Sequence, residues 1–216
     1  MNSLLISYSI VNISSIICVL LGYKLLHPKQ PLYITLCYLG FVVFFFGRFY
    51  ELSRIILNLE LYNTFELGFV GILGAFSFWL SSNFSIKQKV NIKAKKSDNI
   101  KCLLASILVI LLYLVIRNGT VNKLERVIDF IIIVYAASNV YYYLRHLLLN
   151  KEDKTGLLNE LKMYNIFGIC FSILIILLAV AFAYSINSLL LVMSILLSID
   201  LLLMIIAFKK EIKEWK

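Results

Sequence analysis

The sequence predicts an all-α, polytopic membrane protein: a bundle of seven transmembrane helices with its N-terminus outside and its C-terminus in the cytoplasm. Of its 216 residues, 61% are hydrophobic and only 15% are charged, whereas about a quarter of an ordinary soluble domain is charged. The apolar residues gather in runs close to the ~20 residues that cross a bilayer core as a helix. The Lys and Arg residues gather between alternate runs, as the positive-inside rule describes.

Seven apolar runs are expected to form the helices of a single transmembrane domain, residues 1–216. The first should be a retained helix, because the sequence before it has no basic region and no small-residue cleavage site. The chain's two prolines, Pro28 and Pro31, lie between the first and second runs, so no run is interrupted by proline. In chain order, the expected helices cover residues 4–26, 32–57, 62–84, 102–116, 124–149, 161–184 and 188–208.

Polar segments separate the later runs. A short acidic link over residues 58–61 follows the second run, and a lysine-rich stretch over residues 87–101 follows the third. The Asn118-Gly119 pair predicts a turn between the fourth and fifth runs. A charged loop over residues 150–160 precedes the sixth run, and residues 185–187 turn the chain into the seventh.

The basic residues determine the predicted orientation. With the N-terminus outside, sixteen of the 21 Lys and Arg residues lie toward the cytoplasm. Lys and Arg favour cytoplasmic loops, so the net charge of +9 needs no nucleic-acid partner. The five that lie toward the outside are Arg48, Arg54, Arg117, Lys123 and Arg126.

Charged side chains near the outer ends of three predicted helices indicate a polar site. Arg48, Glu51 and Arg54 are spaced by three and so share one helix face. Charges inside membrane spans are rare and usually face the interior of the bundle, which makes each one a candidate for function. We therefore expect a ligand-binding pocket in the outer half of the bundle, in which Arg48 or Arg54 holds an anionic or polar ligand group. Its expected residues are Asn12, Arg48, Glu51, Glu66 and Asp129. The alternative is that these are structural ion pairs and side chains that extend to the interface.

A second, deeper polar layer is expected around Asp200 and Asn139. A lone carboxylate at the centre of a membrane helix costs ~2.5–3.5 kcal/mol on insertion scales, so Asp200 should be protonated or hydrogen-bonded. A proton relay or cation site here would suit a small permease. The alternative is a structural hydrogen bond from Asp200 to Asn139 or to a nearby serine.

Two further patterns favour structural roles. Gly68, Gly71, Gly74 and Ala75 form a small-residue face that should let a neighbouring helix approach closely. The segment 141–146, with three tyrosines followed by Leu, Arg and His, should form an aromatic belt with a basic flank at the cytoplasmic end of the fifth helix. The four cysteines show no Cys-x-x-Cys spacing and are expected to pack as small apolar residues.

Several kinds of chemistry lack their motifs. The chain contains no His-Glu-x-x-His, Gly-x-Ser-x-Gly or P-loop sequence. We therefore expect no metal, no cofactor and no catalytic residue, and do not expect an enzyme. The expected partners are the lipid bilayer and, at the basic loops, a cytoplasmic protein; the sequence predicts no oligomeric state.

The segment 65–83, which reads FELGFVGILGAFSFWLSSN, resembles the third span of seven-helix sensor regions attached to bacterial kinases. It also resembles stand-alone bacterial membrane proteins. The resemblance covers one span and implies no functional residue. The outer charges, together with the lack of a kinase or cyclase output domain in the sequence, lead us to expect a stand-alone seven-helix sensor or ligand-binding protein of the bacterial plasma membrane. The alternative is a small permease or proton-coupled carrier that uses Asp200 and Asn139.

Overall fold

The computed structural model describes residues 2–24, 26, 30–57, 67–90, 92, 94–120, 123–153 and 155–213. In this part of the chain the regular structure is helical throughout, with no strand. The helices are α1 (Asn2–Tyr23), α2 (Leu32–Ile56), α3 (Leu67–Val90), α4 (Lys96–Gly119), α5 (Lys123–Leu149), the 3-10 helix η1 (Asn150–Glu152), α6 (Leu157–Glu160), α7 (Lys162–Ala183) and α8 (Asn187–Lys213).

Seven of the described helices, all except η1 and α6, are long and apolar enough to cross a membrane. The predicted all-helical class and the predicted number of spans are therefore confirmed, and the chain has the architecture of a multi-pass membrane protein. Each span hydrogen-bonds its own backbone, which is what a bilayer without water in its core requires.

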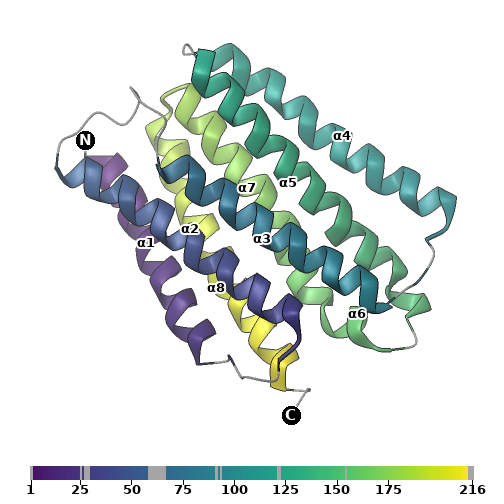
Figure 1. Cartoon of the computed structure of the whole chain (residues 1–216). Coiled ribbons are helices and arrows are strands. Elements are labelled where there is room, and N and C mark those ends of the chain that lie inside the picture. The colour runs from purple at the N-terminus through teal and green to yellow at the C-terminus, as the bar shows by residue number, and fades with distance from the viewer. Residues whose placement is uncertain are drawn as a thin grey trace.

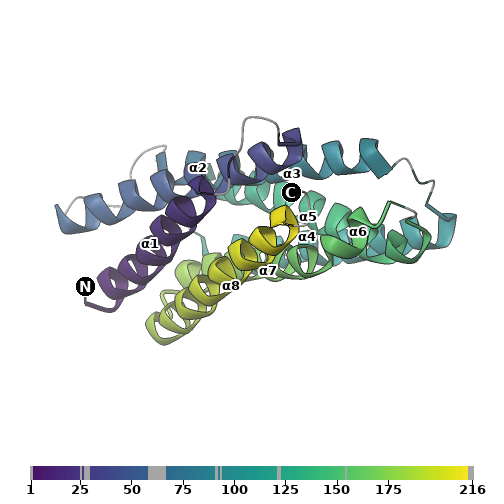
Figure 2. The same cartoon turned by 90° about the horizontal axis from the view of Figure 1, so that it is seen from below.

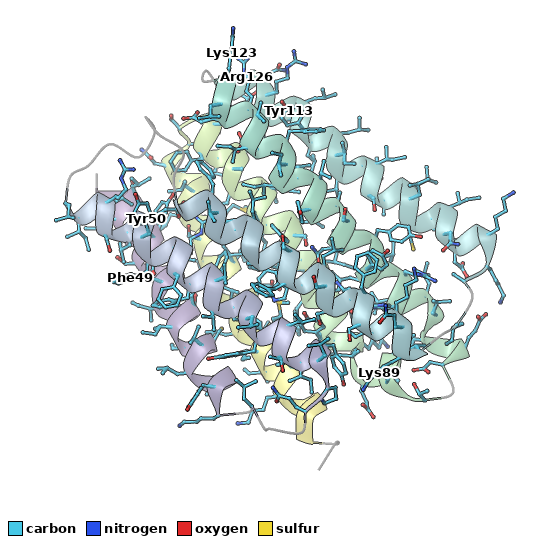
Figure 3. All side chains as sticks on the ribbon, viewed as in Figure 1. Phe49, Tyr50, Lys89, Tyr113, Lys123 and Arg126 are labelled. Carbon is cyan, nitrogen blue, oxygen red and sulfur yellow. The ribbon has the colours of Figure 1, made fainter. Side chains whose placement is uncertain are left out.

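The seven long helices run up and down, so the two termini lie at opposite ends of the bundle (Figure 1). The N-terminus shares one end with the turn from α4 to α5 and the turn from α7 to α8. We call this the Thr120 end, and the opposite end, where α3 finishes, the Lys89 end. Tyr50, Lys123 and Arg126 lie toward the Thr120 end, whereas Lys89 lies at the other (Figure 3).

Six of the long helices form a closed ring in the order α1, α2, α3, α5, α7 and α8, in which each packs on its two neighbours. Helix α4 lies outside this ring, where it contacts α5 and α7. In Figure 2, α2 and α3 form the upper layer of the ring, with α7 and α8 below them. The position of α4 explains why only 22% of its apolar window is buried, the lowest share among the described spans.

The predicted close packing of the small-residue face of α3 is confirmed. A Cβ atom on Gly47 of α2 would lie only 2.7 Å from the Cα atom of Gly71 of α3. One turn away on each side, Gly74 faces Val43 and Gly68 faces the Glu51 side chain. Because small residues let two backbones approach, α2 and α3 pack along most of their length.

Aromatic side chains fill the centre of the ring. The indole of Trp79 lies 4.8 Å from the Phe171 ring and 5.5 Å from the Phe41 ring, centroid to centroid, both in edge-to-face geometry. Phe44 and Phe76 complete the cluster, which joins α2, α3 and α7. Trp79 also donates a hydrogen bond from Nε1 to the Cys37 carbonyl at 3.2 Å, as a buried indole N–H requires.

Helices α3 and α4 extend further into the lysine-rich stretch than expected. Helix α3 continues to Val90, and α4 begins at Lys96, six residues before its expected start at 102. Helix α4 also ends later than expected, so Asn118 and Gly119, predicted to form a turn, are its last helical residues. Lysine is a good helix former and its long side chain reaches water from a helix end. In addition, Asp98 lies in the first turn of α4, where it pairs with Lys101 at 3.3 Å. Lys95 pairs with Glu152 at 2.6 Å, which connects this segment to η1.

The expected aromatic belt at the end of α5 is partly wrong. Tyr143 and His146 are buried inside the bundle, at 1% and 2% exposure. The Tyr143 hydroxyl lies 3.5 Å from that of Tyr164 on α7. Tyr143 points inward because it lies on the face of α5 that packs against α7, where its ring meets Tyr164 and Gly168.

Candidate ligand-binding site

A cavity of about 470 Å³ lies inside the bundle toward the Thr120 end. Helices α1, α2, α3, α4, α5 and α7 all contribute to its wall. Its size lies within the range of about 300–1,000 Å³ that is typical of small-molecule pockets. Four charged side chains, Arg48, Glu51, Glu125 and Asp129, line it together with many apolar side chains.

The pair formed by Arg48 and Glu51 is the most deeply buried charged feature of the cavity. Arg48 Nη1 donates to Glu51 Oε2 at 2.7 Å, and the two side chains are only 6% and 7% exposed. The spacing of three residues places both groups on the face of α2 that points into the bundle. Gly68 makes room for the carboxylate, because a Cβ atom there would collide with it.

Aromatic rings flank the guanidinium group. Its carbon lies 5.4 Å from the centroid of the Phe44 ring and 5.8 Å from that of Tyr8 on α1. Both distances suit a cation–π contact, which helps a buried cation that has lost its water. The Nε atom of Arg48 is buried without a hydrogen-bond partner. A water or a ligand in the cavity is therefore needed to accept from it.

Asp129 brings a second carboxylate into the cavity from α5. Its Oδ2 accepts a hydrogen bond from the Thr120 hydroxyl at 3.4 Å. Among the ion pairs of the described residues, none involves Asp129. The neighbouring Arg126 directs its Nε to the Thr120 carbonyl at 2.8 Å instead. Asp129 therefore presents to the cavity a carboxylate without a basic partner.

The structure brings three of the residues predicted for the outer site together. Arg48, Glu51 and Asp129 line the same cavity. Asn12 does not line it, but holds α1 to α2 by donating to the Arg48 carbonyl at 2.9 Å. It also donates to the Tyr8 carbonyl of its own helix at 3.0 Å. Arg54 lies beside the Tyr50 ring and is not part of the wall. Glu66, also predicted, lies outside the described residues.

Asn139 and Asp200, the two residues of the deeper polar layer, do not form the hydrogen bond that the structural alternative proposed. Asn139 donates to the carbonyls of Phe76 and Tyr135, both at 3.0 Å, and accepts from Asn83 at 3.2 Å. No hydrogen bond links Asn139 to Asp200 in the part of the chain that the structure describes. Asp200 is 6% exposed and its Oδ2 atom is buried without a partner. Neither residue lines the cavity.

Most of the residues that line the cavity could not be identified from the sequence. Helix α7 supplies a large share of it, with Ile175, Ile176, Leu178, Ala179, Phe182 and Ala183. An all-apolar helix gives no indication of which of its faces borders a cavity, because every face is equally suited to lipid or to packing. Glu125 and Thr120 were also missed, although Glu125 lies one turn before Asp129 in α5 and Thr120 directly follows α4.

The chemistry of the wall suits binding rather than catalysis. It combines a paired cation, two further carboxylates and a broad apolar surface, which is the composition of many ligand sites. In the described chain no three His, Cys, Asp or Glu side chains are grouped closely enough to hold a metal ion. Comparison with protein-family models, curated proteins and solved structures gave no match.

Proposed function

We propose that this chain is a stand-alone sensor or ligand-binding protein of the plasma membrane, with its N-terminus outside and a pocket accessible from the outer half. One observation carries the proposal: the cavity lies toward the end of the bundle where three carboxylates and a buried arginine meet. A buried Arg–Glu pair is weak evidence for stability, so its position on a cavity wall favours a role in binding.

The orientation rests on the distribution of basic residues. The sequence predicts sixteen of the 21 Lys and Arg residues on one side of the membrane. Among the described residues, Lys87 and Lys89 finish α3 and Lys96 begins α4, at the Lys89 end. By the positive-inside rule that end faces the cytoplasm, and the cavity then lies in the outer half. A reporter enzyme fused to the C-terminus tests this: activity that requires the cytoplasm supports the orientation, and activity only outside the cell contradicts it.

Signalling would proceed through the packing of the helices. Because the cavity wall is made by six helices, a ligand that binds one arrangement of them more tightly shifts the population toward it. A protein at the basic cytoplasmic surface would then detect the shift, since lysine-rich segments offer charge complementarity to an acidic partner.

The test of the pocket is a substitution that fills it. Ala179→Phe places a ring in the cavity, and Leu108→Phe makes a comparable change on the exposed face of α4. Ligands that raise the melting temperature of the wild type should no longer do so for Ala179→Phe, but should for Leu108→Phe. Retained stabilisation in the filled variant would show that the ligand binds elsewhere.

The alternative function is a small permease or proton-coupled carrier. The observation that favours it is Asp200, whose buried Oδ2 lacks a partner in the middle of α8. An unsatisfied carboxylate at membrane depth suits a group that gains and loses a proton or a cation during transport. Uptake by proteoliposomes distinguishes the two functions: Asp200→Asn should abolish transport if the chain is a carrier, and an unchanged rate would exclude this role for Asp200.

A further inference from the structure

We infer that the ligand of the cavity is a lipophilic cation, an apolar body that carries a positive charge. The inference rests on the proposed ligand-binding function and specifies the chemistry of that same pocket. It differs from the expectation drawn from the sequence, in which Arg48 or Arg54 holds an anionic group.

The charges of the wall favour a cation. Among the described residues, the charged side chains of the wall are one arginine and three acids, with a formal charge of −2. The arginine is already neutralised, because Arg48 and Glu51 lie 2.7 Å apart and are both buried. Asp129, which forms no ion pair among the described residues, therefore places at the cavity a negative charge that Arg48 does not offset.

Apart from Arg48, no Lys or Arg among the described residues lines the cavity. Arg126, at the same end of the bundle, donates to the Thr120 carbonyl instead. Lys123 lies at the tip of the bundle (Figure 3), where its side chain is exposed to solvent. Solvent screens such exposed charges far more than buried ones.

The rest of the wall selects for an apolar body. Isoleucine, leucine, phenylalanine and alanine side chains from α3, α5 and α7 make up most of it. Burying apolar ligand surface against them is favourable at roughly 25 cal/mol per Å². A hydrophilic ion such as sodium would gain nothing from this surface, whereas a hydrophobic ammonium or phosphonium ion would use both features.

A second observation also points to an occupant of the cavity. Arg48 is 5% exposed and lines the cavity, yet its Nε atom has no acceptor. Buried donors are nearly always satisfied in native proteins. An acceptor atom on the ligand would satisfy this donor.

The experiment compares two probes of the same shape and opposite charge. Tetraphenylphosphonium and tetraphenylborate are titrated against the purified protein in lipid nanodiscs, with empty nanodiscs subtracted. The cation should bind at least about tenfold more tightly than the anion, given the size of Coulomb interactions in partly buried sites. Asp129→Asn should reduce this preference about tenfold, and Glu125→Gln should reduce it in the same direction. Asp98→Asn, a matched change outside the cavity, should leave the preference unchanged.

The outcomes separate the inference from the function on which it rests. Equal or tighter binding of the anion, or an unchanged preference in both Asp129→Asn and Glu125→Gln, would overturn the cation inference while a pocket remained. If Ala179→Phe and Ile132→Phe both bound the probes as the wild type does, the pocket itself would be wrong. Melting temperatures measured without probe show whether each variant is folded. Because there are two charge variants and two cavity-filling variants, the test remains valid if one variant of either kind does not fold.

Discussion

Gly47 and Gly71 bring α2 and α3 into backbone contact, since a Cβ atom on Gly47 would lie 2.7 Å from the Cα atom of Gly71. Gly47 directly precedes Arg48 and lies one turn before Glu51, so the separation of these two helices also determines where the buried ion pair lies. Gly68, one turn before Gly71, leaves the space that the Glu51 carboxylate occupies. The packing of α2 against α3 at these glycines, which we call the glycine seam, therefore also determines the geometry of the cavity.

The first prediction concerns this seam. Gly71→Ala places a methyl group against the backbone of Gly47, which cannot move aside as a side chain could. We expect a loss of about 1–3 kcal/mol in the free energy of unfolding, the usual effect of overpacking. Reversible unfolding in mixed micelles measures it.

Gly74→Ala is the matched control. Its added methyl group would lie 2.7 Å from Cγ1 of Val43, a side-chain atom that can rotate away. The loss should therefore be clearly smaller than for Gly71→Ala. Equal losses would mean that backbone contact is not what limits the approach of the two helices.

The second prediction concerns the ion pair. Glu51→Gln keeps the shape of the side chain but leaves the Arg48 charge buried without a counter-charge. Breaking a buried pair in this way costs about 3–5 kcal/mol, so the melting temperature should fall markedly. The double variant Arg48→Gln and Glu51→Gln should recover much of the loss, because no buried charge remains. A double variant as unstable as the single one would contradict this account.

The fold could be predicted from the sequence because hydropathy is a strong signal in a bilayer. Seven apolar runs gave seven long helices, and the spacing of Arg48 and Glu51 predicted one shared face. The ends of α3 and α4 were misjudged because charged residues continue a helix after it leaves the hydrocarbon, so apolar content does not mark where the helix stops. The order of helices around the ring, and the place of α4 outside it, depend on side-chain packing that apolar content does not specify.

The candidate site was predictable only in its charged part. Arg48, Glu51 and Asp129 were expected to lie near one another because each charge falls near the same end of a helix. The partners of Asn12 and Asn139 were not predictable, since backbone carbonyls such as those of Arg48 and Phe76 carry no signal in the sequence. The face of α7 that lines the cavity could not be predicted either, because isoleucine is equally suited to contact lipid, to pack in a core and to line a cavity.

The third prediction concerns the loop that contains α6. The Asp153 carboxylate accepts hydrogen bonds from the Leu158 N–H at 2.7 Å, the Thr155 N–H at 2.9 Å and the Thr155 hydroxyl at 2.6 Å. Partial burial raises the pKa of Asp153, but the three hydrogen bonds outweigh it and lower the pKa below its ordinary value. Their stabilisation is thus complete above about pH 4, the ordinary pKa of aspartate, and is lost as the pH falls through the lowered pKa.

Amide hydrogen exchange of residues 155–160 measures this effect. Once the intrinsic pH dependence is removed, protection of the loop should decrease as the pH falls from 5 to about 3. Asp153→Asn should show weaker protection at pH 5 and little further change on acidification. A loop whose protection follows the same pH curve in both proteins would show that Asp153 does not hold it.

The fourth prediction concerns the buried amides of α3 and α5. Asn139→Leu removes the acceptor of Asn83 and the donor to the Phe76 and Tyr135 carbonyls. Hydrogen bonds between membrane helices average about 0.6 kcal/mol and reach about 1.7, and the amide left unsatisfied on Asn83 adds about 1–3 kcal/mol. We therefore expect a loss of about 2 kcal/mol in the free energy of unfolding.

In a double-mutant cycle with Asn83→Leu, the double variant should lose less stability than the sum of the two single losses, because the second substitution removes the unsatisfied amide. Additive losses would mean that the two amides do not depend on each other, and that the contact between α3 and α5 rests on apolar packing alone.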